Sequence, residues 1–167
     1  MNRYTRLAAA ALLFSAPLCA RAEQPAPILR LPGLPDRAID NAFLRSHHPM
    51  DIRLEDTHGN IEIYHGLPLL EVLEKSGYDI RSMAAERKSS TAVVLITARD
   101  GYAAAFSIGE LRMHRRDPKV FLVGEGPDGP LPENEGPVRL IVYGDNVRSP
   151  YGLARIELKA LAENPHP

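Results

Sequence analysis

The sequence predicts one domain of the mixed α+β or mainly β class. Short segments that alternate apolar and polar residues, or that are rich in β-branched residues, recur between clusters of Gly, Pro, Asn and Asp. This is the pattern of strands joined by turns. Segments with helical periodicity are few and short, so strands outnumber helices. The length of 167 residues is that of one ordinary domain with its own core, even after the loss of a leader.

The first 22 residues have the three parts of a secretory signal peptide. Arg3 and Arg6 give a positive start, residues 7–18 are almost entirely apolar, and residues 20–22 form an A-x-A-like cleavage site. The apolar run is too short to span a bilayer, which needs about 20 apolar residues. We therefore expect a signal peptide over residues 1–22, cleaved near Ala22, and an exported mature chain.

A short lead-in and a helix are expected to follow the leader. Residues 23–36 contain four prolines and are expected to form an extended lead-in rather than a folded element. Asp36 has the side chain of a helix N-cap and precedes a short stretch with apolar spacing. The sequence thus predicts a helix that begins after Asp36 and ends near Arg45.

A hairpin and a second helix are predicted next. Residues 50–54 and 61–64 alternate apolar and polar side chains on either side of a His-Gly-Asn turn, which indicates two paired strands. Residues 65–68 are expected to break the second strand. Pro68 suits the first turn of a helix, the apolar residues after it give that helix a buried face, and Gly77 is expected to end it.

The C-terminal half is expected to consist mostly of strands and turns. Strands are predicted at residues 91–97, 102–106, 120–123, 138–143 and 156–161, the last of which also suits a short helix. Asp100-Gly101 marks a tight turn, and Ser107 is the expected cap of a helix of one to two turns that reaches Leu111. Loops are predicted for the polar or Gly- and Pro-rich stretches at residues 81–90, 124–136 and 144–150.

Composition and motifs exclude several kinds of chemistry. The net charge is −1 and no basic run stands out, so nucleic acid is not an expected partner. The only cysteine, Cys19, lies in the predicted leader, so the mature chain has no thiolate nucleophile or ligand. The sequence contains no G-x-S-x-G motif and no P-loop. The glycine-rich run at 124–129 carries two acids, which would repel a phosphate, so a solvated loop is expected there. Four histidines lie close together in the sequence: His47, His48, His58 and His65. No two of them have the i, i+4 spacing of a helical zinc site, so we expect surface histidines rather than a metal centre.

The most suggestive polar residues lie at predicted strand ends. Arg99, Asp100 and Tyr102 meet at one turn, Arg139 lies inside an otherwise apolar strand, and the loop after that strand carries Asn146, Arg148 and Ser149. A flat heterocycle with amide-like edges could use an aromatic ring to stack on, a carboxylate for its amino group and an Arg for its carbonyl group. Alternatively, Arg139 forms a structural ion pair with Asp100 or Glu110, because an unpaired buried charge is costly.

Four short motifs, taken in order, resemble the oxidoreductase molybdopterin-binding domain. They are YHGLPL at 64–69, DGY at 100–102, GPL at 129–131 and GPVRL at 136–140. The resemblance runs from about residue 37 to 161, which leaves 162–167 as a C-terminal tail. It implies the sulfite-oxidase-type fold: an α+β domain with mainly antiparallel sheets and short helices, whose pterin cleft is lined by turns and strand ends.

The chain departs from the catalytic members of that family. Those members hold molybdenum through a cysteine thiolate, which the mature chain lacks, and the G-x-R element and Trp usual after Arg139 are missing. The chain is instead similar to the PruR group of periplasmic proteins, which bind a reduced, tetrahydropterin-like ligand without metal and control a membrane-bound cyclic di-GMP enzyme. The resemblance implies pterin-binding roles for Asp100, Tyr102, Arg139 and Arg148. Further candidates are residues close to these in the sequence: Arg99, Tyr143, Asn146 and Ser149.

Two alternatives to a pterin-binding sensor remain open at this stage. One is a molybdenum-dependent oxidoreductase with a non-thiolate metal site. The other is a protein–protein adaptor that binds no ligand.

Overall fold

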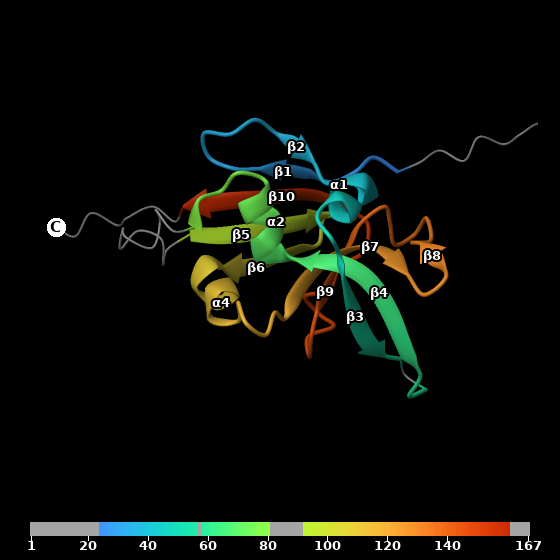
Figure 1. The fold of residues 1–167 in the computed structure, drawn as a ribbon. Helices are drawn as coiled ribbons and strands as arrows, with labels where there is room; N and C mark the ends of the chain where they lie inside the picture. The colour runs from blue at the N-terminus through green and yellow to red at the C-terminus, as the bar shows by residue number, and fades with distance from the viewer. Residues whose placement is uncertain (1–23, 57, 81–91, 161–167) are drawn as a thin grey trace, which may run out of the picture.

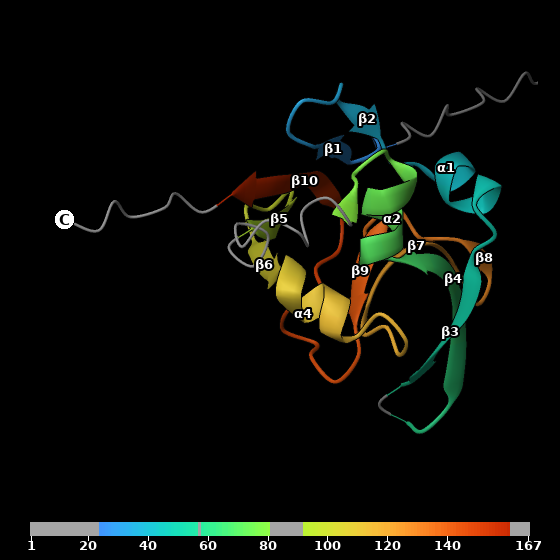
Figure 2. The ribbon, with the colours of Figure 1, turned by 60° about the vertical axis from the view of Figure 1, so that its left-hand side comes forward.

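The computed structural model describes residues 24–56, 58–80 and 92–160. Within them, two sheets of mostly antiparallel strands enclose the main core, and short helices cover one side (Figures 1 and 2). The predicted mixed α+β class is therefore confirmed. The predicted leader, the loop at 81–90 and the tail at 162–167 lie outside the described residues. Among the described residues, no helix has the length and apolar character needed to cross a membrane.

The first sheet joins the two ends of the domain. Its strand order is β2-β1-β10-β5-β6, and these strands are Arg37–Ala38, Ile28–Arg30, Leu153–Ala160, Ala92–Ala98 and Ala103–Ser107. Strand β1 runs parallel to β10, with Leu29 opposite Ile156, and the other strand pairs are antiparallel. The expectation that residues 23–36 form no folded element is wrong, because Leu29 and Leu31 are buried in the main core. Its four prolines flank β1 without interrupting it.

The second sheet carries a projecting hairpin. It is built from β3, β4, β7, β8 and β9, which are Met50–Glu55, Ile61–Pro68, Val120–Gly126, Gly129–Pro130 and Arg139–Val142. The β3–β4 hairpin is confirmed, and it extends away from the body of the domain in both views (Figures 1 and 2). Strand β7 pairs with β4, β8 and β9, so it lies at the centre of this sheet.

Two predicted boundaries in this sheet are wrong. Strand β4 does not break at residue 65 but continues to Pro68, because residues 65–68 pair with β7. Gly66 permits this pairing: a Cβ atom there would lie 2.2 Å from the Leu122 carbonyl oxygen. The predicted loop at 124–136 likewise begins too early, since β7 extends to Gly126 and pairs with β8.

The short helices begin at side-chain caps or at a proline. Helix α1 (Asn41–Ser46) is capped by Asp40, whose carboxylate accepts a hydrogen bond from the Phe43 backbone N–H. The predicted cap at Asp36 is therefore wrong, because residues 37–38 form β2 and delay the helix. Helix α2 (Leu69–Lys75) follows Pro68, and Gly77 lies just after it with a positive φ, as expected. Helix α4 (Ile108–Met113) is capped by Ser107, as expected.

A second, smaller core lies within the second sheet. Its buried members, Ile52, Tyr64, Phe121, Val123 and Ile141, face away from the main core. The Tyr143 hydroxyl, just after β9, accepts a hydrogen bond of 3.0 Å from the backbone N–H of Arg53 in β3. Because β3 and β9 are at opposite edges in the strand order, this bond shows that the sheet curls around its own core.

Candidate functional site

A cavity of about 490 Å³ lies between α2, α4 and the segment that follows β9. Part of its lining is apolar, from Leu70, Leu111, Val120, Val142 and Pro118. The polar part of its lining includes Glu110 of α4, Arg148 and Tyr143. The polar part is the larger one, because it also includes Glu71, Glu74, Lys75, His114, Arg115 and Lys119. A concave site of this size that combines apolar surface with polar groups is a candidate small-molecule binding site.

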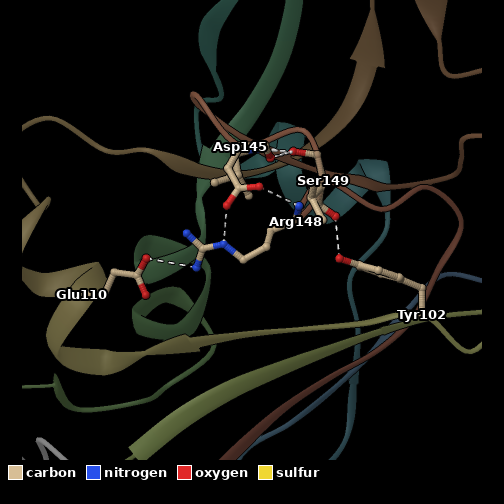
Figure 3. A network of polar contacts seen from close by, with 7 residues as sticks. Tyr102, Glu110, Asp145, Arg148 and Ser149 are labelled. Carbon is tan, nitrogen blue, oxygen red and sulfur yellow. Dashed lines mark hydrogen bonds and ion pairs between the residues drawn. The ribbon is translucent and has the colours of Figure 1, made fainter.

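Arg148 is the centre of a polar network at this cavity (Figure 3). Its Nε donates to Asp145 Oδ2 at 2.6 Å, and its Nη1 donates to Glu110 Oε1 at 3.2 Å. The guanidinium carbon also lies 4.9 Å from the centre of the Phe106 ring. Arg148 therefore connects α4 to the loop after β9 and is held in a fixed orientation at the cavity wall.

The charges in this network reinforce one another. Hydrogen bonds from the Arg148 side chain hold the pKa of Asp145 below its usual range. In the other direction, the hydrogen bond to Asp145, supported by Glu110, raises the pKa of Arg148 above its usual value. Arg148 and Asp145 thus both carry their full charge at neutral pH.

The loop at 144–150 is fixed by short polar contacts. The Ser149 hydroxyl donates to the Asp145 carbonyl and accepts from the Val142 backbone N–H, both at 2.9 Å. The Tyr102 hydroxyl donates to the Val147 carbonyl oxygen at 2.5 Å (Figure 3). These contacts place Tyr102 and Ser149 in the support of the loop that carries Arg148.

The remaining residues predicted near this loop have local roles. Asp100 accepts a hydrogen bond from the Tyr102 backbone N–H at 2.9 Å, which shapes the β5–β6 turn. The Asn146 carbonyl accepts from the Ser149 backbone N–H at 3.3 Å. Tyr143 is among the residues that line the cavity, but its ring packs edge-on against Phe121 in the second core, with ring centres 5.2 Å apart.

Arg139 is in a different place. It lies on the face of β9 that it shares with Ile141, whereas Leu140 and Val142 face the main core. Only 7% of Arg139 is exposed. Its guanidinium carbon lies 4.3 Å from the Tyr151 ring centre and 5.1 Å from that of Tyr64.

The ion-pair partner of Arg139 is neither of the two we expected. Nη1 of Arg139 donates to Glu135 Oε2 at 2.6 Å, whereas Glu110 pairs with Arg148 and Asp100 shapes its own turn. Arg139 Nε is buried and has no hydrogen-bond partner. Burial raises the pKa of the neighbouring Tyr64 phenol to about 12, so this ring stays neutral beside the cation.

The structure therefore brings together some of the predicted residues and separates others. Tyr143 and Arg148 line the cavity, and a second group adjoins them through the Arg148 loop or the β5–β6 turn: Asp100, Tyr102, Asn146 and Ser149. Arg139 is on the opposite face of β9. Arg99 is also apart, because its guanidinium donates to Gln24 and to the Pro25 carbonyl.

Sequence reasoning missed Glu110 and Asp145 as members of the site. Glu110 was considered only as an ion-pair partner of Arg139, and Asp145 was not considered. A signal for Glu110 was present: Ser107-x-x-Glu110 has the spacing of a capping box, which places an acid at the start of α4. Its backbone N–H does donate to Ser107 Oγ at 2.9 Å, but its carboxylate pairs with Arg148.

The histidine cluster does not assemble. Within residues 24–56, 58–80 and 92–160, no group of three or more His, Cys, Asp or Glu side chains is placed to hold a metal ion. His65 Nδ1 lies 3.1 Å from Asp51 Oδ1 on neighbouring strands, and His47 Nδ1 lies 2.8 Å from the Phe43 carbonyl oxygen.

Comparison with known proteins gives the chain no family. No protein-family model matches it. No curated protein matches it either. The function must therefore be argued from the geometry of the cavity.

Proposed function

We propose that this protein binds a reduced pterin in the cavity beside Arg148 and acts as a non-catalytic sensor in the periplasm. The single observation that carries this proposal is the pairing of Glu110 with Arg148 at the wall of a partly apolar cavity of about 490 Å³. The finer assignment to a sulfite-oxidase-type fold belongs to the same proposal. It is supported by the order of the four short motifs and by the mixed α+β architecture.

The two side chains match the polar edge of a pterin ring. That edge presents an amino group and a ring N–H as donors next to a carbonyl oxygen as acceptor. A carboxylate such as Glu110 accepts from the donors, while a guanidinium such as Arg148 donates to the carbonyl. The apolar side chains of the lining, such as Leu70 and Leu111, would contact the faces of the bicyclic system.

The network also keeps Arg148 in place when a ligand competes for Glu110. Asp145 bonds both the Nε and the backbone N–H of Arg148, at 2.6 and 3.0 Å. The Glu110 contact is the longer one, at 3.2 Å. A ligand edge can therefore insert between Glu110 and Arg148 while Asp145 retains the cation, which reduces the cost of reorganisation.

A sensor needs a partner that reads whether the ligand is bound. The resemblance described above implies the periplasmic domain of a membrane-bound cyclic di-GMP synthase or phosphodiesterase, and we retain that partner as part of the proposal. The loop at 144–150 is the part of the cavity wall most suited to signal occupancy. It carries Arg148 and, one residue before it, the exposed side chain of Val147.

Anaerobic calorimetric titration with tetrahydrobiopterin tests the proposal. We expect saturable binding, and we expect Glu110→Gln and Arg148→Met each to weaken it by about 1–3 kcal/mol, or roughly 5- to 150-fold. Arg139→Met is the matched control: it removes a buried arginine from the opposite face of β9 and should leave the affinity unchanged.

Four outcomes would contradict the proposal. Absence of saturable binding would rule out a pterin as the ligand. Loss of binding in Arg139→Met alone would indicate that the ligand binds on the other face of β9. Stoichiometric molybdenum in the purified protein would favour the oxidoreductase. Partner binding that is unaffected by any pterin would favour the adaptor.

A further inference from the structure

The two most exposed large apolar side chains among the described residues belong to Met113 and Val147, at 76% and 77%. Met113 is the last residue of α4 and follows Glu110 by about one helical turn. Val147 directly precedes Arg148. Each is therefore close in sequence to one member of the Glu110–Arg148 pair, and this pair joins the two segments that carry them.

Arginines surround Met113. Arg115 is neutralised by Glu74 at 3.0 Å. Arg112 and Arg116 are exposed, and neither forms an ion pair with another described residue. Among the described residues, the end of α4 thus presents two cations without an ion-pair partner, on either side of an exposed methionine in the sequence. Composition alone does not single out this group, because the run at 112–116 is short and the overall net charge is −1.

We propose that this surface, formed by Arg112, Met113, Arg116 and Val147 and here called the α4 tip, contacts an anionic phospholipid membrane. Apolar side chains on projecting turns can enter the boundary between headgroups and acyl chains. Arginines next to them bind lipid phosphates, and the negative surface potential of the leaflet attracts them.

A lipid surface fits the α4 tip better than an acidic protein does. Met113 and Val147 lie on two separate segments, α4 and the loop after β9, which the ion pair of Glu110 and Arg148 joins. They do not form the continuous apolar patch that a folded partner covers at the core of an interface. A fluid leaflet accepts separate apolar side chains without requiring such a patch.

Membrane contact would bring the ligand cavity close to the bilayer. His114 and Arg115, which lie between Met113 and Arg116 in the sequence, line that cavity. The inference does not rest on the proposed pterin function, because none of the four residues of the α4 tip is among the residues that line the cavity. Lipid binding and pterin binding can therefore fail separately.

Vesicle flotation tests the inference. The purified protein is mixed with vesicles of phosphatidylcholine alone, or of phosphatidylcholine and phosphatidylglycerol in equal parts, at low and high salt. We expect binding to the anionic vesicles only, with loss at high salt. Arg112→Glu combined with Arg116→Glu should lower the partition coefficient about tenfold or more, and Met113→Ser should lower it severalfold.

Matched variants make the test specific. Arg37→Glu combined with Arg53→Glu reverses the charge of two exposed arginines in β2 and β3, which are not part of the α4 tip. This double variant should leave vesicle binding unchanged. All variants share one N-terminus, so differences among them report on the α4 tip. Equal binding to neutral and anionic vesicles, or full binding by the Arg112 and Arg116 variant, would overturn the inference. Binding of polyglutamate without binding of vesicles would also overturn it, and would assign the surface to an acidic protein.

Discussion

Replacing Arg139 with methionine separates a structural role for this residue from a ligand-binding one. The change breaks the ion pair in which Arg139 Nη1 lies 2.6 Å from Glu135 Oε2. The Arg139 side chain is 9% exposed and the Glu135 side chain is 22% exposed. Breaking a buried pair costs about 3–5 kcal/mol, and the water access of Glu135 places the cost near the lower end. Loss of the contacts with Tyr64 and Tyr151 adds about 1–2 kcal/mol. Methionine also removes the unpartnered Nε, which recovers about 1–3 kcal/mol.

The expected net effect is a loss of about 2–3 kcal/mol in the free energy of unfolding. Urea denaturation followed by circular dichroism measures it, and with a slope of about 2 kcal/mol/M the midpoint should fall by roughly 1–1.5 M. Arg148→Met, whose side chain is 35% exposed, should lower the midpoint much less. The reasoning is refuted if Arg139→Met keeps the midpoint of the parent protein, since the cluster around Arg139 would then contribute no stability.

Three further predictions concern stability. Gly66→Ala places a Cβ atom 2.2 Å from the Leu122 carbonyl oxygen and should cost about 3 kcal/mol or more in urea denaturation; a smaller loss would mean that β4 and β7 can separate easily. Ser107→Ala removes the cap of α4 and should cost about 1 kcal/mol, seen as a fall of roughly 3 °C in Tm. Folding raises the pKa of Tyr64 from about 10 to about 12, so the folded protein holds this proton more tightly and stability should fall by about 1–2 kcal/mol as the pH rises from 10 towards 12. Tyr64→Phe should show a smaller fall over that range, and identical pH profiles would contradict the assignment.

The elements that the sequence predicts well are those with strong local signals. The β3–β4 hairpin, the Ser107 cap and the glycine after α2 follow from alternation, cap chemistry and a positive φ, all of which act over a few residues. Strand β1 was missed because its place depends on β10, its partner near the other end of the chain. The extent of β4 was missed because Gly66 and Pro68 are usual strand breakers, and only the close approach to β7 explains them.

In the candidate site, too, local patterns could be predicted from the sequence and long-range contacts could not. The sequence drew attention to Arg148 and Tyr143, which line the cavity, because polar residues at strand ends are a local pattern. It could not pair Arg148 with Glu110, since that contact joins two elements that are far apart in the chain. Arg139 was recognised as a buried cation, but alternation alone does not tell which face of β9 turns towards a cavity.

The parallel pairing of β1 with β10 has a consequence for how the polypeptide is made. A ribosome delivers residues 28–30 long before residues 153–160, so until β10 is made β1 has only the two-residue strand β2 beside it. Strand β10 also separates β1 from β5 in the sheet order, which means that the nascent sheet lacks its central strand until β10 has been made. A chain built in this way stays open while it is being extruded, and a premature stop before residue 153 would leave two half-sheets with nothing to join them.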